Sequence, residues 1–304
     1  MGDNSCSIIL GLAIQHLSLA VTLPAYLLYL TRFGPLARIT GPQALTIPLR
    51  ITSRHLLILP ISVALGYFVP SVVMMLPHPL ITAHARQLYI VVWQFFPVYT
   101  VGIQAGLNAF AQWAEVASHG REKEDKLKSE EAKTVRYLYD ARTVYLIAFT
   151  VAAVSNLNVV AICTFPEWLT AQFPFGLFTN VSFKSVFIPH APTLGYRVWD
   201  MIDGIHSFLH FDAYISFLAA IFYVHNMARN AEKAGSEAPV TEKTKAENQG
   251  RRLRFGFNML AYTLVSGPIG AVVMGMWERD QRVVDQLVDE ARGWKVEEKA
   301  GKAE

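Results

Sequence analysis

The sequence predicts an all-α fold, a polytopic bundle of six transmembrane helices. Of its 304 residues, 52% are apolar and only 17% are charged, and the mean hydropathy is +0.28, which is too hydrophobic for an ordinary soluble domain. A transmembrane helix needs about 20 consecutive, mainly apolar residues. Six windows meet this requirement, at residues 7–30, 55–76, 88–110, 143–163, 204–226 and 255–277.

The six windows are interpreted in chain order. The first is expected to stay in the mature protein, because it has neither the basic region before it nor the small-residue cleavage site after it that a signal peptide has. An Arg-containing segment separates it from the second window. Charged runs follow the third window ("REKEDKLKSEEAKTVR") and the fifth window ("RNAEKAGSEAPVTEKTKAENQGRRLR"). These polar segments predict solvated loops between the spans.

A seventh crossing is the alternative to six. The aromatic segment "WLTAQFPFGLFTNVSFKSVFI" between windows four and five could be re-entrant or could cross at a tilt. Its apolar run is interrupted by Pro174, Gly176, Asn180 and Lys184. We therefore predict that it caps the bundle at the lumenal interface.

The distribution of basic residues predicts the orientation, because the basic excess stays on the cytoplasmic side. The loops after windows one, three and five hold 18 of the 27 Lys and Arg residues. With six spans both termini are then lumenal, and the sequon at Asn180 is lumenal as well. The predicted bundle covers residues 1–277, with charged loops at 111–142 and 227–254, and a charged tail at 278–304. We expect the membrane to be that of the endoplasmic reticulum.

Composition and motifs exclude several classes of protein. No Lys/Arg run is dense enough for nucleic-acid binding. Cys6 and Cys163 lack metal-ligand spacing, and the sequence contains no "DDxxD" or "DxDD" motif of the soluble terpene synthases. We expect no metal and no cofactor. The expected partners are the bilayer and a small lipophilic molecule.

One carboxylate stands within an apolar helix, in the stretch "HSFLHFDAYISF". Ionisable groups inside spans are rare and usually mark a site. Asp212 is predicted to lie in the same lumenal-half layer as His16, Gln94 and Asn156, judged by its depth at about 1.5 Å per residue. Desolvation among aromatic rings disfavours the charged form, so we expect a neutral acid that donates a proton to a substrate. The alternative is a structural Asp212 that hydrogen-bonds a neighbouring helix or pairs with His16.

Aromatic side chains around this layer predict an apolar binding cavity. Ring faces attract cations, so several rings could stabilise a carbocation where a carboxylate would quench it. Each ring taken singly is also compatible with a lipid-facing or core position. The predicted catalytic residues are Asp212, Gln94 and His16, and the predicted substrate-binding residues are Trp93, Phe96, Tyr99, Asn156, Phe208, His210, Phe211 and Tyr214.

Three stretches, "RHLLILPISVALGYFVPSVVMMLPHP", "QLYIVVWQFFPVY" and "SFLHFDAY", resemble the integral-membrane terpene cyclases of fungal meroterpenoid pathways, especially the ascochlorin and ascofuranone type. The resemblance implies metal-free cyclisation of a farnesylated aromatic substrate, commonly a terminal epoxide, begun by an intramembrane acid. Asp212 matches the family's aromatic-flanked aspartate. Pyripyropene-type cyclases add a glutamate on an early span. This chain has no Asp or Glu between Asp3 and Glu115, so either Gln94 or His16 takes that role or the chemistry differs.

The expected function is therefore a membrane-bound terpene cyclase of the isomerase type, which closes rings without net loss of atoms. Two rivals remain. The first is a transporter or lipid-binding membrane protein, disfavoured by the lack of visible repeats and of paired broken helices. The second is a non-catalytic scaffold for other membrane-bound pathway enzymes, and association with such enzymes is also compatible with the cyclase.

Overall fold

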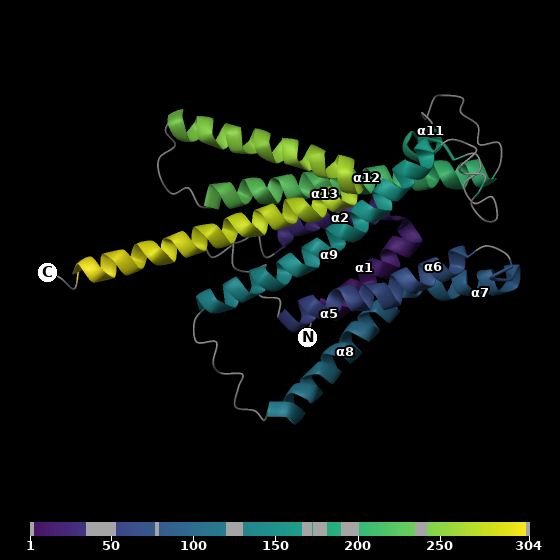
Figure 1. The fold of residues 1–304 in the computed structure, drawn as a ribbon, viewed down its shortest axis with the longest axis horizontal. Helices are drawn as coiled ribbons and strands as arrows, with labels where there is room; N and C mark the ends of the chain where they lie inside the picture. Colours follow the sequence, from purple (N-terminus) through teal and green to yellow (C-terminus); the bar gives the residue numbers. More distant parts are fainter. Residues whose placement is uncertain are drawn as a thin grey trace.

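The computed structural model describes residues 3–34, 53–76, 79–119, 130–165, 172, 181–189, 201–234 and 242–301. In these ranges the regular structure is entirely helical, as predicted. The helices in Figure 1 are α1 (Asp3–Leu17), α2 (Leu19–Phe33), α5 (Ser53–Val63), the π-helix η2 (Ala64–Phe68), α6 (Val69–Met75), α7 (Ala83–Trp93), α8 (Phe96–His119), α9 (Glu130–Thr164), α11 (Phe183–Phe187), α12 (Met201–Ala234) and α13 (Glu242–Gly301).

Among the described residues, four helical segments are long and apolar enough to cross a membrane. They are Arg54–Met75, Arg136–Thr164, Asp203–Arg229 and Arg252–Arg282, and the bent pair α7–α8 provides a fifth if it is counted as one span. The structure thus supports a helical membrane protein but does not confirm six or seven spans. The difference in count arises at helix breaks in the first and third predicted windows, and a further break lies within the sixth.

The first break divides the predicted span 7–30 at Ser18. This residue has φ 73° and ψ 158°, a backbone conformation that is otherwise almost confined to glycine. Helices α1 and α2 on either side have 15 residues each. At 1.5 Å per residue this is about 22 Å, less than the thickness of about 30 Å of a hydrocarbon core. Neither helix is long enough to span the hydrocarbon core by itself.

The second break lies between α7 and α8, inside the predicted span 88–110. The helix axis changes direction by 64° there. Gln94 and Phe95 form the bend, and Pro97 follows as the second residue of α8. Proline fits this position because the first N–H groups of a helix have no partner within the helix. The bend is therefore supported by the local sequence.

The third break reverses the chain inside α13. Gly267 has φ 69° and ψ 177°, and Pro268 follows. We call residues 242–266 the first arm and residues 268–301 the second arm. Asn258 on the first arm donates a hydrogen bond to Glu278 on the second, so the arms lie side by side, and Figure 1 shows both extending from the turn toward the same end of the molecule. The apolar segment Arg252–Arg282 is therefore folded back on itself, which corrects the prediction of a single straight helix at 255–277.

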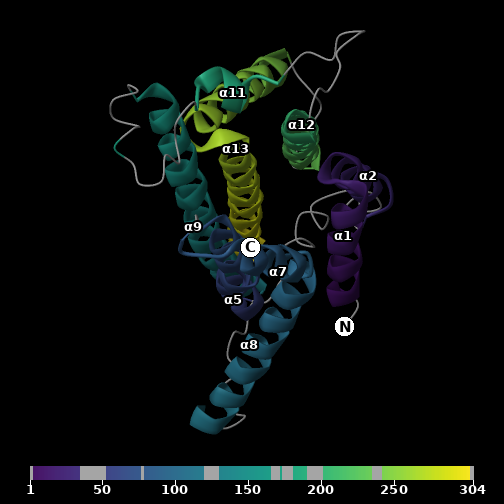
Figure 2. The same ribbon diagram turned by 90° about the vertical axis from the view of Figure 1, so that its right-hand side faces the viewer.

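The second arm packs along α9, and α12 packs against both α2 and α13 (Figure 2). The buried core lies where α12 meets the two arms. Its central side chains are Val224 on α12, Phe255 and Met259 on the first arm, and Ala271 on the second. Gly275 on the second arm packs directly against Val224 on α12. A larger side chain at position 275 would have no space.

Several sequence expectations concern segments that are only partly described. Pro174, Gly176 and Asn180 of the aromatic segment lie outside the described residues, and so does the middle of the charged loop 111–142. Within the aromatic segment, α11 is a short helix with a capping box at Ser182. The sequence places the boundary between bundle and tail at residue 277. The helix is not interrupted there and continues to Gly301.

Candidate functional site

Asp212 lies in α12, and its carboxylate contacts the start of α2. Its Oδ1 accepts a hydrogen bond of 2.7 Å from the backbone N–H of Ala20. Ala20 is the second residue of α2, where N–H groups lack a partner within the helix. Asp212 thus caps α2 from a neighbouring helix, next to the strained Ser18. Within the described part of the chain, no hydrogen bond reaches Oδ2.

His16 and Gln94, the residues expected to assist Asp212, lie at two of the helix breaks. His16 is in the last turn of α1 and is exposed, and Gln94 is exposed in the bend between α7 and α8. Neither makes a hydrogen bond or ion pair with Asp212 among the described contacts. The structural alternative of a His16–Asp212 pair is thus not observed, whereas a hydrogen bond to another helix is.

The two breaks are connected through α1. Gly11 of α1 packs directly on Pro97 at the start of α8. Gly11 precedes Ser18 by seven residues, which is about 10 Å along a helix. The α7–α8 bend therefore adjoins α1 about two turns from the residues that Asp212 contacts.

Two predicted aromatic residues, Trp93 and Phe96, form a cluster with Tyr67, which the sequence analysis did not select. The ring centroids are 5.5 Å apart for Trp93–Phe96, 4.8 Å for Tyr67–Phe96 and 6.0 Å for Tyr67–Trp93. The indole N–H of Trp93 donates to Ser71 Oγ at 2.8 Å. Tyr67 and Ser71 are four residues apart and so lie on one helical face. This spacing is the sequence signal that could have added Tyr67 to the predicted aromatic residues.

Three further predicted rings are not part of this cluster. Phe208 and Phe211 lie on α12 near Asp212, Phe208 exposed and Phe211 half-buried. Tyr99 lies one turn after Phe96 on α8 and is 36% exposed. No ring contact joins these three to Trp93 or Phe96 in the described structure, so their role as substrate-binding residues stays a prediction.

His210 and Tyr214 hold the short helix α11 against α12. His210 Nε2 lies 2.7 Å from the carbonyl oxygen of Val186, and the Tyr214 hydroxyl donates to the carbonyl of Phe187. Both residues are two positions from Asp212, about 200° around a helix. They therefore face away from Asp212, and their described contacts are with the polypeptide on that opposite side.

Asn156 lies at the Gly267 turn. Its Nδ2 donates to the carbonyls of Leu264 and Val265, both at 3.2 Å. These carbonyls lie in the last turn of the first arm, where the helix provides no donor. Asn156 on α9 therefore stabilises the end of the first arm, and any role in substrate binding would be additional to this contact.

The contact between α12 and the second arm fixes the relative depth of these features. Gly275 packs on Val224. Further along both helices, Arg282 lines one depression with Ala228 and Arg229, so the two helices run in the same direction. Counting back eight residues on each helix places the Gly267 turn level with residue 216. Asp212 is one helical turn away, about 6 Å. That Asp212 and Asn156 line one layer stays a prediction.

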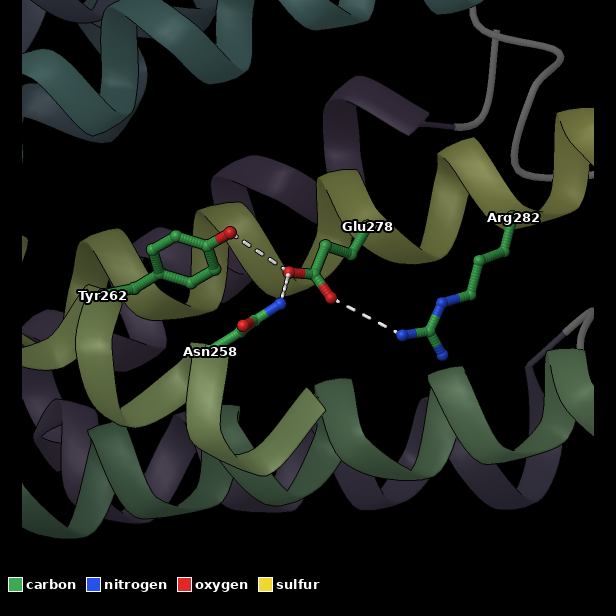
Figure 3. Close-up of polar contacts among 4 residues, drawn as sticks. All are labelled: Asn258, Tyr262, Glu278 and Arg282. Carbon is green, nitrogen blue, oxygen red and sulfur yellow. Dashed lines mark hydrogen bonds and ion pairs between the residues drawn. The ribbon is translucent and has the colours of Figure 1, made fainter. Parts of the chain in front are cut away.

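A second polar cluster, missed by the sequence analysis, joins the two arms of α13 (Figure 3). Glu278 Oε1 accepts hydrogen bonds from Asn258 Nδ2 at 2.8 Å and from the Tyr262 hydroxyl at 3.1 Å. Its Oε2 lies 3.5 Å from a guanidinium nitrogen of Arg282. By the same register this cluster is roughly 20 Å from Asp212 along α12. It is a separate site.

Adjacent to it, Asp280 connects the second arm to α9. Asp280 is 1% exposed and forms an ion pair with Arg279, which is 2% exposed. The Tyr145 hydroxyl on α9 donates to Asp280 Oδ2 at 2.7 Å. Buried charges are tolerated where they are paired and hydrogen-bonded. These contacts fix the second arm on α9.

A comparison with protein families identifies the chain. The CtvD domain family matches residues 4–284, most of the sequence. The chain belongs to the CtvD domain family.

The CtvD match includes both polar sites, since it extends from α1 to just beyond Arg282. Among curated proteins, the terpene cyclase atmA of Aspergillus flavus is 23% identical over 282 residues, which cover 90% of this chain and 66% of that relative. This CtvD chain therefore spans slightly less than two thirds of the relative's length. No solved structure matches this chain.

For this member of the CtvD family, the described residues contain no group of three His, Cys, Asp or Glu side chains placed to hold a metal ion. The charged residues that the sequence analysis missed, Glu278, Arg279, Asp280 and Arg282, lie in "WERDQR" at 277–282. This charged stretch follows the last apolar window, so the sequence predicts that it belongs to a tail. Only the reversal at Gly267 brings it next to Asn258 and Tyr262.

Proposed function

We propose that this protein is a membrane-bound terpene cyclase in which Asp212 is the acid that starts cyclisation. The distant similarity to a terpene cyclase supports the class of reaction. The position of Asp212 supports the assignment of the acid: an intramembrane carboxyl group beside a helix break, with Oδ1 bound to Ala20 N–H. The proposed substrate is a farnesylated aromatic compound, as the free chain or its terminal epoxide, and the proposed location is the endoplasmic reticulum.

In the proposed reaction Asp212 gives its proton to the epoxide oxygen or to the terminal alkene. The C–O bond opens, or the alkene becomes a carbocation, and successive double bonds form the ring C–C bonds. Loss of a C–H proton ends the sequence, so product and substrate have the same formula. The N–H of Ala20 and the positive end of α2 stabilise the carboxylate that remains after proton transfer.

The remaining residues have positional roles in this proposal. Trp93 and Phe96, together with Tyr67, offer ring faces to a cation, each contributing roughly 0.5 to 2 kcal/mol. His16 or the Asp212 carboxylate takes the final proton, and Gln94 is the polar group available at the α7–α8 bend. No metal ion is required for this chemistry.

The deciding experiment is a microsomal assay with epoxyfarnesyl and farnesyl aromatic substrates in the presence of a chelator. Wild type is expected to produce an isomer of equal mass with a different chromatographic retention. Asp212→Asn is expected to lower the rate at least a hundredfold, because an amide cannot supply the proton. The Asn side chain keeps an oxygen that can accept the hydrogen bond from Ala20 N–H. The unfolding temperature of the Asp212→Asn variant in detergent should therefore remain close to that of wild type.

A second variant separates catalysis from capping. Asp212→Ala removes both the proton and the hydrogen bond, and we expect it to unfold about 1 kcal/mol more easily than wild type. Full activity in Asp212→Asn would overturn the assignment of the acid. Activity that is abolished by the chelator would overturn the metal-free mechanism.

Transport is the second candidate, and one observation favours it. Breaks at Ser18, Gln94–Phe95 and Gly267 resemble the discontinuous helices that form substrate sites in transporters. The sequence argument against transport relied on the lack of visible repeats and of paired broken helices, and the second of these grounds is therefore weakened. Sealed vesicles that accumulate the prenylated substrate unchanged would support a transporter. A scaffold would show neither conversion nor accumulation and would tolerate replacement of Asp212.

A further inference from the structure

The open end of the α13 hairpin meets the end of α12 in a surface depression rich in cationic side chains. Its walls come from α12 and from both arms, so it exists only because the chain reverses at Gly267. The lining residues are His225, Ala228, Arg229, Arg252, Phe255 and Arg282.

The depression has a defined internal geometry. The buried ring of Phe255 forms its floor, with the guanidinium carbon of Arg282 5.4 Å above the ring centroid and the His225 ring 6.2 Å away. Glu278 adjoins the depression, and its Oε2 lies 3.5 Å from Arg282. The other oxygen of Glu278 is occupied by Asn258 and Tyr262. Arg282 is therefore held in place by contacts on two sides.

Three guanidinium groups around one depression favour an oxyanion as the ligand. Each guanidinium has five N–H donors in a planar fork that matches phosphate oxygens, so it can bind a phosphate while keeping contacts within the protein. Arg229, Arg252 and Arg282 come from three different helical segments. A ligand that joins them would stabilise the closed hairpin.

The surrounding surface indicates that the phosphate belongs to a lipid. Arg252 is followed on the first arm by an apolar stripe at helical spacing, in which every side chain is strongly exposed. The stripe consists of Leu253 (70%), Phe257 (72%), Leu260 (59%) and Leu264 (71%). Acyl chains can lie along such a face, while the head group reaches the charged depression at its end.

We propose that the depression binds the phosphate of an anionic phospholipid at the membrane surface. Basic pockets between transmembrane helices on the cytoplasmic side are suited to such head groups. This inference does not depend on the proposed cyclase activity. It predicts a saturable lipid site that closes the base of the α13 hairpin.

The test uses the purified full chain in nonionic detergent, titrated with dioleoyl phosphatidic acid. Native mass spectrometry counts bound lipid, and the unfolding temperature reports stabilisation. Phosphatidic acid is expected to bind saturably and raise the unfolding temperature, and dioleoyl phosphatidylcholine is expected to do neither. Arg252→Gln should raise the dissociation constant about fivefold, the effect of one cationic contact near a membrane surface.

Arg254→Gln is the matched control, since it removes the same charge from an exposed position two residues away, about 200° around the helix, and does not line the depression. We expect its affinity to equal that of wild type. Equal losses in both variants would overturn the site in favour of general surface charge. If inorganic phosphate raises the unfolding temperature of wild type as much as phosphatidic acid does, the lipid assignment is overturned. If Arg252→Gln does not fold, Arg229→Gln on α12 makes the same test.

Discussion

At the scale of single residues, the chemistry of a side chain could be read from the sequence, but its partner could not. Asp212 was selected because a carboxylate in an apolar helix is unusual. Its described partner, the N–H of Ala20, is a backbone group 192 residues away in the chain. Every residue except proline has such a donor, so no side-chain pattern could have indicated this one.

Glu278 is the residue whose role changes most once its contacts are known. We expect Glu278→Ala to lower the free energy of unfolding by about 2 to 4 kcal/mol, because it leaves Asn258 and Tyr262 without their charged acceptor. Glu278→Gln keeps an acceptor oxygen and loses mainly a partly exposed ion pair with Arg282, so its effect should be about 1 kcal/mol or less. Denaturation in detergent measures both. Equal stability of the two variants would show that the cluster does not hold the arms together.

At the scale of helices, hydropathy located the apolar segments but not their breaks. A window of apolar residues has the same mean hydropathy whether the helix is straight, bent by 64° as between α7 and α8, or reversed as in α13. Gly267 followed by Pro268 was a local cue for a break. The direction of the chain after the break depends on the backbone angles of one residue and on packing against α9.

Replacing glycine by alanine should have opposite effects on stability at Gly267, in the turn, and at Gly256, within the first arm. Gly267→Ala should destabilise the protein by roughly 1 to 3 kcal/mol, because its φ of 69° disfavours a side chain and an added Cβ would lie 3.2 Å from Asn156 Oδ1. Gly256→Ala, in the first arm with open space around it, should stabilise the helix by up to about 1 kcal/mol. Thermal unfolding of the two variants in parallel is the measurement. A stabilised Gly267→Ala variant would contradict the observed turn.

At the scale of the whole molecule, the reversal in α13 changes the expected topology. With a sixth crossing, the six basic residues of the C-terminal segment would lie opposite the basic loops. With a hairpin they join those loops, so that 24 of the 27 Lys and Arg residues lie on one side. The folded-back arrangement thus satisfies the positive-inside rule better than the predicted one.

The topology can be tested with reporters of sidedness. A tag after residue 304 and a tag inserted near residue 238 are expected to be accessible from the same, cytoplasmic, side of sealed microsomes. A glycan acceptor placed near residue 190 should be modified in the lumen. A C-terminal acceptor that is glycosylated while the one near 238 is not would restore the sixth crossing.

The sequence by itself determined that this chain is a helical membrane protein, where its apolar segments lie, and that Asp212 is an unusual acid within one of them. These properties follow from composition and local periodicity. The tertiary structure decided the helix breaks, the capping of α2 by Asp212, the joining of Tyr67 to Trp93 and Phe96, and the hairpin that assembles Glu278 and the arginine-lined depression. Each of these depends on contacts between residues distant in the chain or on single backbone angles, which hydropathy does not record.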